Sequence, residues 1–588
     1  MAQSMHRPTS PISERAAARR RLLDALGTAL AVVLVLTGGA LTAHWYFTTR
    51  SLAWQVRRGL DLLAGADTLQ RARAALDRWE NETRPAWDSR TEDLITHLYS
   101  DYPLDDQRVR LLLTRVAGAD YGDRRADWKH WYDSRRRLRA GSQPEILHGD
   151  KSVRLEPRWT APIGLTAWFS TIIPLDGQIY VASLGENFDD TQDAADGVVR
   201  VDGATGQSEL IFSPPDRPGR GPRDVVGVAA GEDCLFVACL NGTVHCITAG
   251  GEPRWEAHVG SPIAGPPLAV DFNDDHVTDV IVATSAGRVV ALSGQSGRTA
   301  WVETVAQPPP GTSLLGATLA LGDVLPGQGP ELVVTLPTGS VEVLAVRNGR
   351  SRWRHDFADG TVAGAVSRGG NRELGLPAYL GDRAARVWTL TSSGQSLQAV
   401  IWAALSLHRE ETLIAGLRTL REEPEGPPLL LACPTGGYGG NRAGVCAIGP
   451  EGVQWRLPVD GALWATPAVA DLNGDRAQEI VAVSVQPRSD GRLVGVVTIV
   501  SQAGHVLHQL ALTAAIECSP VVADVDGDGC LEVLIADQSG LLHCFGTGRQ
   551  GPVRWGSFGG DSHNTRNADN AFSFGQVPFK YQWHWQPE

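Results

Sequence analysis

Three short segments of the sequence place side-chain oxygens at the same four positions, and these residues are the best candidates for chemistry. Each segment has Asp at position 1, Asn or Asp at position 3, Asp at position 5, and Asp or Glu at position 9. The residues are Asp271, Asn273, Asp275 and Asp279; Asp471, Asn473, Asp475 and Glu479; and Asp524, Asp526, Asp528 and Glu532. With a main-chain carbonyl from position 7, such oxygens suit Ca²⁺ better than Zn²⁺ or Mg²⁺. The sequence therefore predicts three calcium sites.

Each single loop has a simpler interpretation as an Asp/Asn-rich turn that holds no metal. Recurrence in three loops favours the metal, since an isolated turn need not keep all four oxygens. The loops are not EF-hands, because the spacing stops at position 9 and no helical pattern flanks it. A fourth loop from Asp323 to Glu331 keeps only the first and last carboxylates, and we expect it to have lost the ion.

The loops belong to a repeated unit, which must position them. A Gly or Ala followed by a strand that alternates apolar and polar residues recurs eight times, usually followed by a Gly turn and often by a Trp. The copies begin at Gly197, Gly242, Gly287, Gly339, Ala385, Gly444, Gly495 and Gly540. Another short apolar strand precedes most copies, and each acidic loop leads into one of these preceding strands.

This periodicity predicts a mainly β fold, a β-propeller with four strands in each blade. One such sheet cannot bury both of its faces, whereas a ring of sheets can. Eight copies predict eight blades, or seven if the weak fifth unit around 363–408 is not a blade. An array of β-sandwiches would need a period about twice as long.

The N-terminal region predicts a membrane anchor. Residues 25–43 are uncharged and mostly apolar, four arginines precede them, and an aromatic group follows at 45–47. This is the pattern of a membrane-spanning helix with a cytoplasmic N-terminus. A cleaved signal peptide is the alternative, and both interpretations export the remainder of the chain.

The domain organisation follows from these patterns. We expect a basic cytoplasmic tail at 1–22, a transmembrane signal anchor at 23–47, a helical membrane-proximal region at 48–145, a propeller at 146–572 and a C-terminal tail at 573–588. The helical region would be a spacer, although the segment from Gly118 to Asp123 and the tryptophans after it are similar to part of a HEAT-like repeat. The polar segment 142–154 is the expected linker.

Composition excludes several function classes. The net charge is −13, and the repeats show no basic face interleaved with aromatic residues, so nucleic acid is not an expected partner. The eight cysteines form no CxxC or Cys/His metal spacing, which argues against zinc. Buried thiols are the simplest interpretation, with a pairing of Cys433 and Cys446 as the alternative in an oxidising compartment.

The acidic loops resemble FG-GAP/VCBS repeats, which are known from the propellers of integrin α-chains. The units with Gly-x-Val-x-Ala-Leu, a Ser/Thr-Gly turn and Trp resemble the repeats of PQQ-like, or quinoprotein-like, propellers. Together the two resemblances cover about 155–570. The segment from Trp555 to Thr565 is also similar to one that borders such propellers and helps to close the ring. The resemblances imply calcium loops that stabilise blades, and non-enzymatic members that bind proteins or carbohydrates.

Catalysis is not the expected activity. A PQQ-dependent quinoprotein dehydrogenase is the main alternative, but the vicinal Cys-Cys pair of that family is absent and no cofactor-binding set matches. A propeller polysaccharide lyase or hydrolase would need a titratable pair that the sequence does not place. We expect His245, His505, His543 and His563 to serve structure.

We therefore expect a non-catalytic, extracytoplasmic, calcium-stabilised propeller that binds a protein or glycan partner. Its binding surface would be the central funnel and the loops of one rim. Three long insertions are the main candidates for these loops: Glu186 to Asp196, Pro308 to Ser313 and Gly436 to Ala443.

Overall fold

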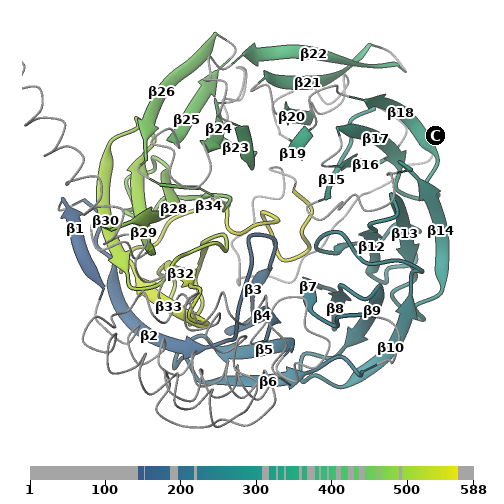
Figure 1. Cartoon of the computed structure of the whole chain (residues 1–588), viewed down its shortest axis with the longest axis horizontal. Coiled ribbons are helices and arrows are strands. Elements are labelled where there is room, and N and C mark those ends of the chain that lie inside the picture. The colour runs from purple at the N-terminus through teal and green to yellow at the C-terminus, as the bar shows by residue number, and fades with distance from the viewer. Residues whose placement is uncertain are drawn as a thin grey trace, which may run out of the picture. The chain divides into compact units, whose positions relative to one another are not determined.

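The computed structural model describes residues 144–566 (Figure 1). Gaps in this range fall at 151, 186–195, 217–220, 308–316, 326–328, 337–338, 357–360, 367–377, 383–385, 394–395, 405–411, 422–428, 436–443, 450, 460, 464 and 489–492. The chain divides into two compact units, Met1–Tyr132 and Asp133–Glu588. The predicted anchor and helical region lie outside the described residues, and within those residues no helix is long and apolar enough to span a membrane.

The described part of the chain is built from strands that form eight sheets. Six sheets are four-stranded antiparallel meanders of consecutive strands. They contain β3 (Ile172–Leu175), β4 (Gln178–Leu184), β5 (Asp196–Asp202) and β6 (Ser208–Phe212); β7 (Val225–Ala230), β8 (Leu235–Cys239), β9 (Thr243–Ile247) and β10 (Pro253–His258); β11 (Leu268–Val270), β12 (Asp279–Ala283), β13 (Arg288–Leu292) and β14 (Thr299–Thr304); β15 (Thr318–Gly322), β16 (Glu331–Thr335), β17 (Ser340–Ala345) and β18 (Ser351–Asp356); β19 (Thr361–Val366), β20 (Ala378–Asp382), β21 (Arg386–Ser393) and β22 (Ser396–Ala404); and β23 (Thr412–Arg421), β24 (Leu429–Thr435), β25 (Gly444–Gly449) and β26 (Gly452–Pro458).

Two sheets depart from this plan because they recruit strands from the two ends of the described chain. One contains β27 (Ala468–Ala470), β28 (Glu479–Pro487), β29 (Leu493–Ser501) and β30 (Val506–Leu512), with β1 (Glu145–Gly149) added beyond β30 and β34 (Val553–Trp555) added beyond β27. The other contains β31 (Val521–Ala523), β32 (Glu532–Ala536) and β33 (Leu541–Gly546), and its fourth strand is β2 (Glu156–Pro162).

The eight repeat copies of the sequence coincide with the third strands of the eight sheets. These strands are β5, β9, β13, β17, β21, β25, β29 and β33. The weak fifth copy forms β21, and therefore follows the same plan as the others. The fold is mainly β and propeller-like, as the periodicity predicts.

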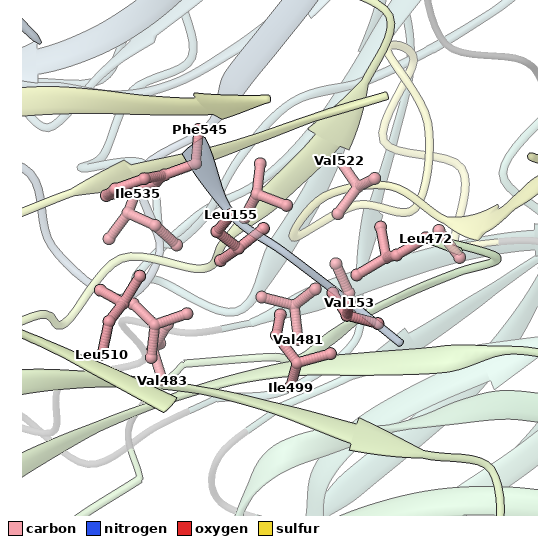
Figure 2. Close-up of a cluster of buried hydrophobic side chains, with 14 of the residues drawn as sticks. Val153, Leu155, Leu472, Val481, Val483, Ile499, Leu510, Val522, Ile535 and Phe545 are labelled. Atoms are coloured by element: carbon pink, nitrogen blue, oxygen red, sulfur yellow. The ribbon is translucent and has the colours of Figure 1, made fainter. Parts of the chain in front are cut away.

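Apolar side chains between successive sheets form the core. The cluster between sheets β27–β30 and β31–β33 includes Val481, Ile499, Val522 and Phe545, and Figure 2 shows these side chains packed together from both sheets. Similar clusters join the sheet of β31–β33 to β3–β6, and join each following pair of neighbouring sheets as far as β19–β22. Another cluster joins β23–β26 to β27–β30. Strands β19 and β23 connect the remaining pair. Where the side chains are described, the sheets thus bury their faces against their neighbours, and a single blade cannot bury both of its faces.

Tryptophans of the fourth strands connect neighbouring sheets on the outside. The indole Nε1 of Trp159, Trp255, Trp301 and Trp455 donates to Gly203 O, Gly294 O, Val346 O and Gln502 O of the next sheet, at 2.8, 2.7, 3.0 and 2.9 Å. Each acceptor lies in a turn between third and fourth strands. A glycine in each of these turns lies against the ring; at Gly297, for example, a Cβ would fall 2.6 Å from Trp255 Cε3. The repeated Gly and Trp of the sequence therefore form one contact between sheets.

The start of the described chain corrects one expectation, and both of its ends pair with distant strands. The segment 142–154 was expected to be a linker, but β1 lies within it and pairs with β30. The outer place of the last sheet belongs to β2, which pairs with β33. Trp555, which begins the expected closing segment, lies in β34, and this strand pairs with β27. Pairing with a distant segment thus supplies the fourth strand of the last sheet and adds an outer strand to the sheet before it.

Candidate metal-binding loops

The three acidic loops occupy equivalent places in three sheets. Each connects a first strand to a second strand: β11 to β12, β27 to β28, and β31 to β32. Their backbones also agree, because positions 4 and 6 have positive φ in every loop. These residues are Asp274 and His276, Gly474 and Arg476, and Gly527 and Gly529. The glycines adopt this conformation without strain, whereas Asp274, His276 and Arg476 must be held there by the loop.

The predicted ligand side chains hold each loop in shape through the same hydrogen bonds. In the first loop, Asp271 accepts from the backbone N–H groups of Asp274 (2.8 Å) and His276 (2.9 Å). Asn273 Oδ1 accepts from Asp275 N at 2.8 Å, and Asp275 Oδ1 accepts from Val277 N at 2.8 Å. The corresponding bonds recur in the loops that begin at Asp471 and Asp524.

The carboxylate at position 9 lies beneath each loop, at the start of the second strand. Asp279, Glu479 and Glu532 are buried, and each accepts a hydrogen bond from the backbone N–H of position 2. Asp279 also accepts from Gly294 N at 2.8 Å, which attaches the loop to the turn between β13 and β14.

Two of the loops bring carboxylate oxygens together. Oxygens of Asp271, Asp275 and Asp279 lie within 4.8 Å of one another, and so do oxygens of Asp524, Asp526 and Glu532. Asp528 is not in the second set, and its Oδ1 accepts from Cys530 N. In the remaining loop the amide of Asn473 donates to Asp475 Oδ2 at 3.1 Å and to Glu479 Oε1 at 3.3 Å.

Burial and like charge make these buried carboxylates unfavourable as anions. Burial, followed by the charges of neighbouring aspartates, raises the pKa of Asp279, Glu479 and Glu532 to about 7. Among the described residues, Glu532 Oε1 has no hydrogen-bond partner, whereas Glu532 Oε2 accepts from Val525 N at 3.1 Å. A hard cation would remove both the repulsion and the unpaired oxygen, so the residues present fit Ca²⁺.

The degenerate loop keeps the buried carboxylate without the others. Glu331 Oε2 accepts from Val324 N at 2.9 Å, as position 9 accepts from position 2 in the acidic loops, and also from Leu325 N at 3.0 Å. Burial raises the pKa of Glu331 to about 8. Glu331 therefore shares the backbone contacts of position 9 but has no full set of acidic neighbours, and the loss of an ion here stays a prediction.

The four candidate histidines have different surroundings. His245 is buried against Phe212, with ring centroids 5.1 Å apart, and His505 is exposed. His543 Nε2 lies 2.9 Å from Asp537 Oδ2, and its Nδ1 lies 3.4 Å from Thr160 Oγ1. This Asp-His-Thr network joins β2 to the last sheet. Sequence reasoning could not find it, because Thr160 lies 383 residues from His543.

The C-terminal segment 556–566, with His563 near its end, lies along the inner edges of several first strands. Carbonyl oxygens of Gly556, Ser562, His563 and Thr565 accept from backbone N–H groups of β31, β7, β11 and β15, at 2.8 to 2.9 Å. The side chain of Asn564 donates to Val228 O and Pro267 O, both at 2.9 Å. Figure 1 shows this segment, in yellow, inside the circle of labelled strands. The expected closing segment therefore connects the first strands of four sheets.

Comparison with known proteins gives one family match. Residues 195–412 match the family described as "Outer membrane protein assembly factor BamB". The matched stretch carries PQQ-like propeller repeats. It includes the fourth and fifth repeat copies as well as the first three, but it ends before the acidic loops at 471 and 524. No curated protein matches the sequence.

Several solved structures are similar to the chain at low identity. BamB from Moraxella catarrhalis is 14% identical, with a TM-score of 0.42, and the match covers 67% of this chain and 100% of that one. Sqt1 from Saccharomyces cerevisiae is 9% identical, with a TM-score of 0.45, and the match covers 68% and 99%. The quinohemoprotein alcohol dehydrogenase from Comamonas testosteroni is 14% identical, with a TM-score of 0.44, and the match covers 67% and 77%.

Proposed function

We propose that this protein is an extracytoplasmic, calcium-stabilised β-propeller of eight blades that binds a protein or glycan partner without catalysis. The eight sheets with buried faces support the ring. The arginines before residue 23, the apolar run at 25–43 and the aromatic group at 45–47 support a retained membrane anchor that places the propeller outside the cytoplasm.

The distribution of connections between the two rims is the observation that carries the proposal. In an antiparallel meander, the connections after the first and third strands lie at one rim, and those after the second and fourth lie at the other. The acidic loops follow first strands. The long segments 186–196 and 436–443 lie between second and third strands, and 308–313 lies between a fourth strand and the next first strand. The strand order thus puts the acidic loops at one rim and the strand ends that flank the three long segments at the opposite rim, while the segments themselves, apart from Asp196, lie outside the described residues.

This separation divides the roles of the two rims. A cation at each acidic loop would tie a first strand to a second strand and keep those blades rigid. The opposite rim would then present long polar connections from a fixed frame, which is how loops commonly provide binding surfaces. The calcium would therefore support binding without touching the partner.

The C-terminal segment favours binding over catalysis. A quinoprotein dehydrogenase or a lyase would need access to the inner strand edges for a cofactor or a substrate. Backbone donors of β7, β11, β15 and β31 are already engaged there by residues 556–565. Displacing this segment would leave several buried backbone groups unpaired, at a cost of about 1–3 kcal/mol each.

The test uses the full-length protein in detergent and begins with calcium. Calorimetric titration should show calcium uptake, and added calcium should raise the melting temperature. The absence of both would remove the calcium part of the proposal.

The second part of the test concerns the rim. Segments 187–195, 309–313 and 437–442 are each replaced by a short Gly-Ser connection, and captured envelope proteins and glycan-array binding are compared with those of the unaltered protein. The proposal is supported if Glu532→Gln still binds a partner of the unaltered protein and the variants with shortened connections do not. A partner unaffected by all three replacements, or turnover of a bound glycan or of an alcohol with added PQQ, would contradict it.

A further inference from the structure

A cleft of about 480 Å³ opens between sheets β7–β10 and β11–β14. Asp233 and Arg254 line it from the first sheet, and Thr278 and Gly294 line it from the second. Arg254 makes a two-pronged ion pair with Asp233, at 2.7 and 2.9 Å. The thiol-bearing residue Cys234 is also part of the lining, so the cleft gives small solutes a route to a cysteine.

A second cysteine lies beside the first on the same face of the sheet. Phe236 of β8 is paired with Cys246 of β9, and Cys234 precedes Phe236 by two residues, so Cys234 and Cys246 are diagonal neighbours. Both belong to the apolar cluster between these two sheets, whereas Cys239 belongs to the cluster on the other face. Each thiol is the largest influence on the pKa of the other, and the two influences have opposite directions.

The surroundings distinguish the roles of the two thiols. The hydrogen bond from Cys234, together with the positive charge of Arg254, holds the pKa of Cys246 below its ordinary value. The same hydrogen bond and burial raise the pKa of Cys234. Cys246 is fully buried, while Cys234 retains 8% exposure and lines the cleft. Access therefore makes Cys234 the thiol that a reagent meets first, and the more acidic Cys246 beside it can accept the proton that Cys234 must lose.

We propose that Cys234 and Cys246 form a reversible disulfide through thiol–disulfide exchange with a low-molecular-weight disulfide that enters the cleft. Cys234 gives its proton to the Cys246 thiolate and attacks one sulfur of the reagent, which releases one reagent thiolate and leaves a mixed disulfide on Cys234. The released reagent thiolate takes the proton from Cys246. Cys246 then attacks Cys234 Sγ and releases the second reagent thiol. Two cysteine thiols are oxidised, and one reagent disulfide is reduced to two thiols. This inference depends neither on the calcium sites nor on a partner.

The experiment incubates the folded full-length protein with oxidised glutathione, then unfolds it, alkylates the remaining thiols and digests it with trypsin. The peptide 224–254 holds Cys234, Cys239 and Cys246 and no internal Lys or Arg. We expect this peptide to lose two hydrogens and to carry one alkyl group, located on Cys239 by fragmentation. Dithiothreitol should restore all three alkylation sites.

Serine variants separate the two steps. Cys246→Ser should trap one glutathione on Cys234, and Cys234→Ser should take up none in this peptide. Cys239→Ser is the matched control and should form the disulfide as the unaltered protein does. Mapping one peptide also keeps the result independent of any pairing between Cys433 and Cys446.

Three outcomes would overturn the inference. In the first, all three thiols of the peptide remain open to alkylation after oxidation. In the second, the bond forms through Cys239. In the third, Cys234→Ser accepts glutathione as readily as Cys246→Ser does.

Discussion

The carboxylate at position 9 of each acidic loop offers the sharpest test of the calcium sites, and Glu532→Gln is the most informative change. Glutamine keeps the shape of the side chain, and its oxygen can still accept from Val525 N. Its amide group can occupy the place of Glu532 Oε1, which has no hydrogen-bond partner among the described residues. The variant should therefore fold normally but lose the buried negative charge that a cation needs.

The magnitude follows from the pKa of Glu532, which burial raises from 4.5 to about 7. This shift corresponds to about 3 kcal/mol, and solvent near the rim reduces it to about 1–2 kcal/mol. Because the pKa is raised in the folded protein, the associated stability is present below pH 4.5 and is lost as the pH rises through about 7. With calcium removed by a chelator at about pH 8, the free energy of unfolding of Glu532→Gln should therefore exceed that of the unaltered protein by about 1–2 kcal/mol.

Calcium should reverse this order of stability, because only the unaltered protein keeps the carboxylate that binds the ion. Binding requires the ionised carboxylate, and the ionised fraction of a group with a pKa of about 7 falls about tenfold between pH 8 and pH 6. The calcium affinity of the unaltered protein should fall by about the same factor, which calorimetric titration at both pH values would measure. Glu532→Gln should bind one fewer ion at either pH.

Glu331→Gln is the matched control, since Glu331 makes the same backbone contacts in the degenerate loop. It should stabilise the protein above about pH 8 without changing the calcium titration. Calcium affinity that is equal at pH 8 and pH 6, or a loss of bound calcium in Glu331→Gln, would refute the reasoning.

Three further predictions concern the contacts between sheets, and chemical denaturation measures each of them. Trp455→Phe keeps most of the ring packing but removes the indole hydrogen bond, so the free energy of unfolding should fall by about 1–2 kcal/mol; an unchanged value would mean that the bond is not formed. Gly297→Ala should cost more than Gly177→Ala, since both glycines have positive φ (67° and 75°) but only the first would place a Cβ against Trp255; equal losses would contradict the contact. Asn564→Ala leaves two buried carbonyl groups without their donor and should cost about 2–4 kcal/mol, and a loss below 1 kcal/mol would argue against its place at the inner strand edges.

Much of the fold could be predicted from the sequence because its information is local and repeated. The alternation after Gly242 or Gly287 is enough to specify a strand, and the Gly turn and Trp that follow specify its connection. The acidic loops were equally accessible, since nine consecutive residues contain every side chain that shapes them. The separation of the acidic loops from the three insertions needed only the strand order.

The remainder depends on contacts between segments that are distant in the chain. The repeat pattern did not reveal that the outer place of the last sheet belongs to β2, near the start of the described chain. No local signal distinguishes a strand that joins its own sheet from one that is replaced. The same limit applies to Thr160 and His543, whose pairing exists only because β2 joins β33.

The position of β2 also has a consequence for the order of assembly. The last sheet lacks its outer strand until a segment near residue 160 returns to one near residue 543, and β31, β7, β11 and β15 gain partners only when residues 556–565 are available. Such long-range pairings form slowly, because the entropy of closing the chain must be lost before any contact compensates for it. The final strands must therefore be synthesised before the ring of sheets can close. An exported chain of this design would cross the membrane first and assemble afterwards.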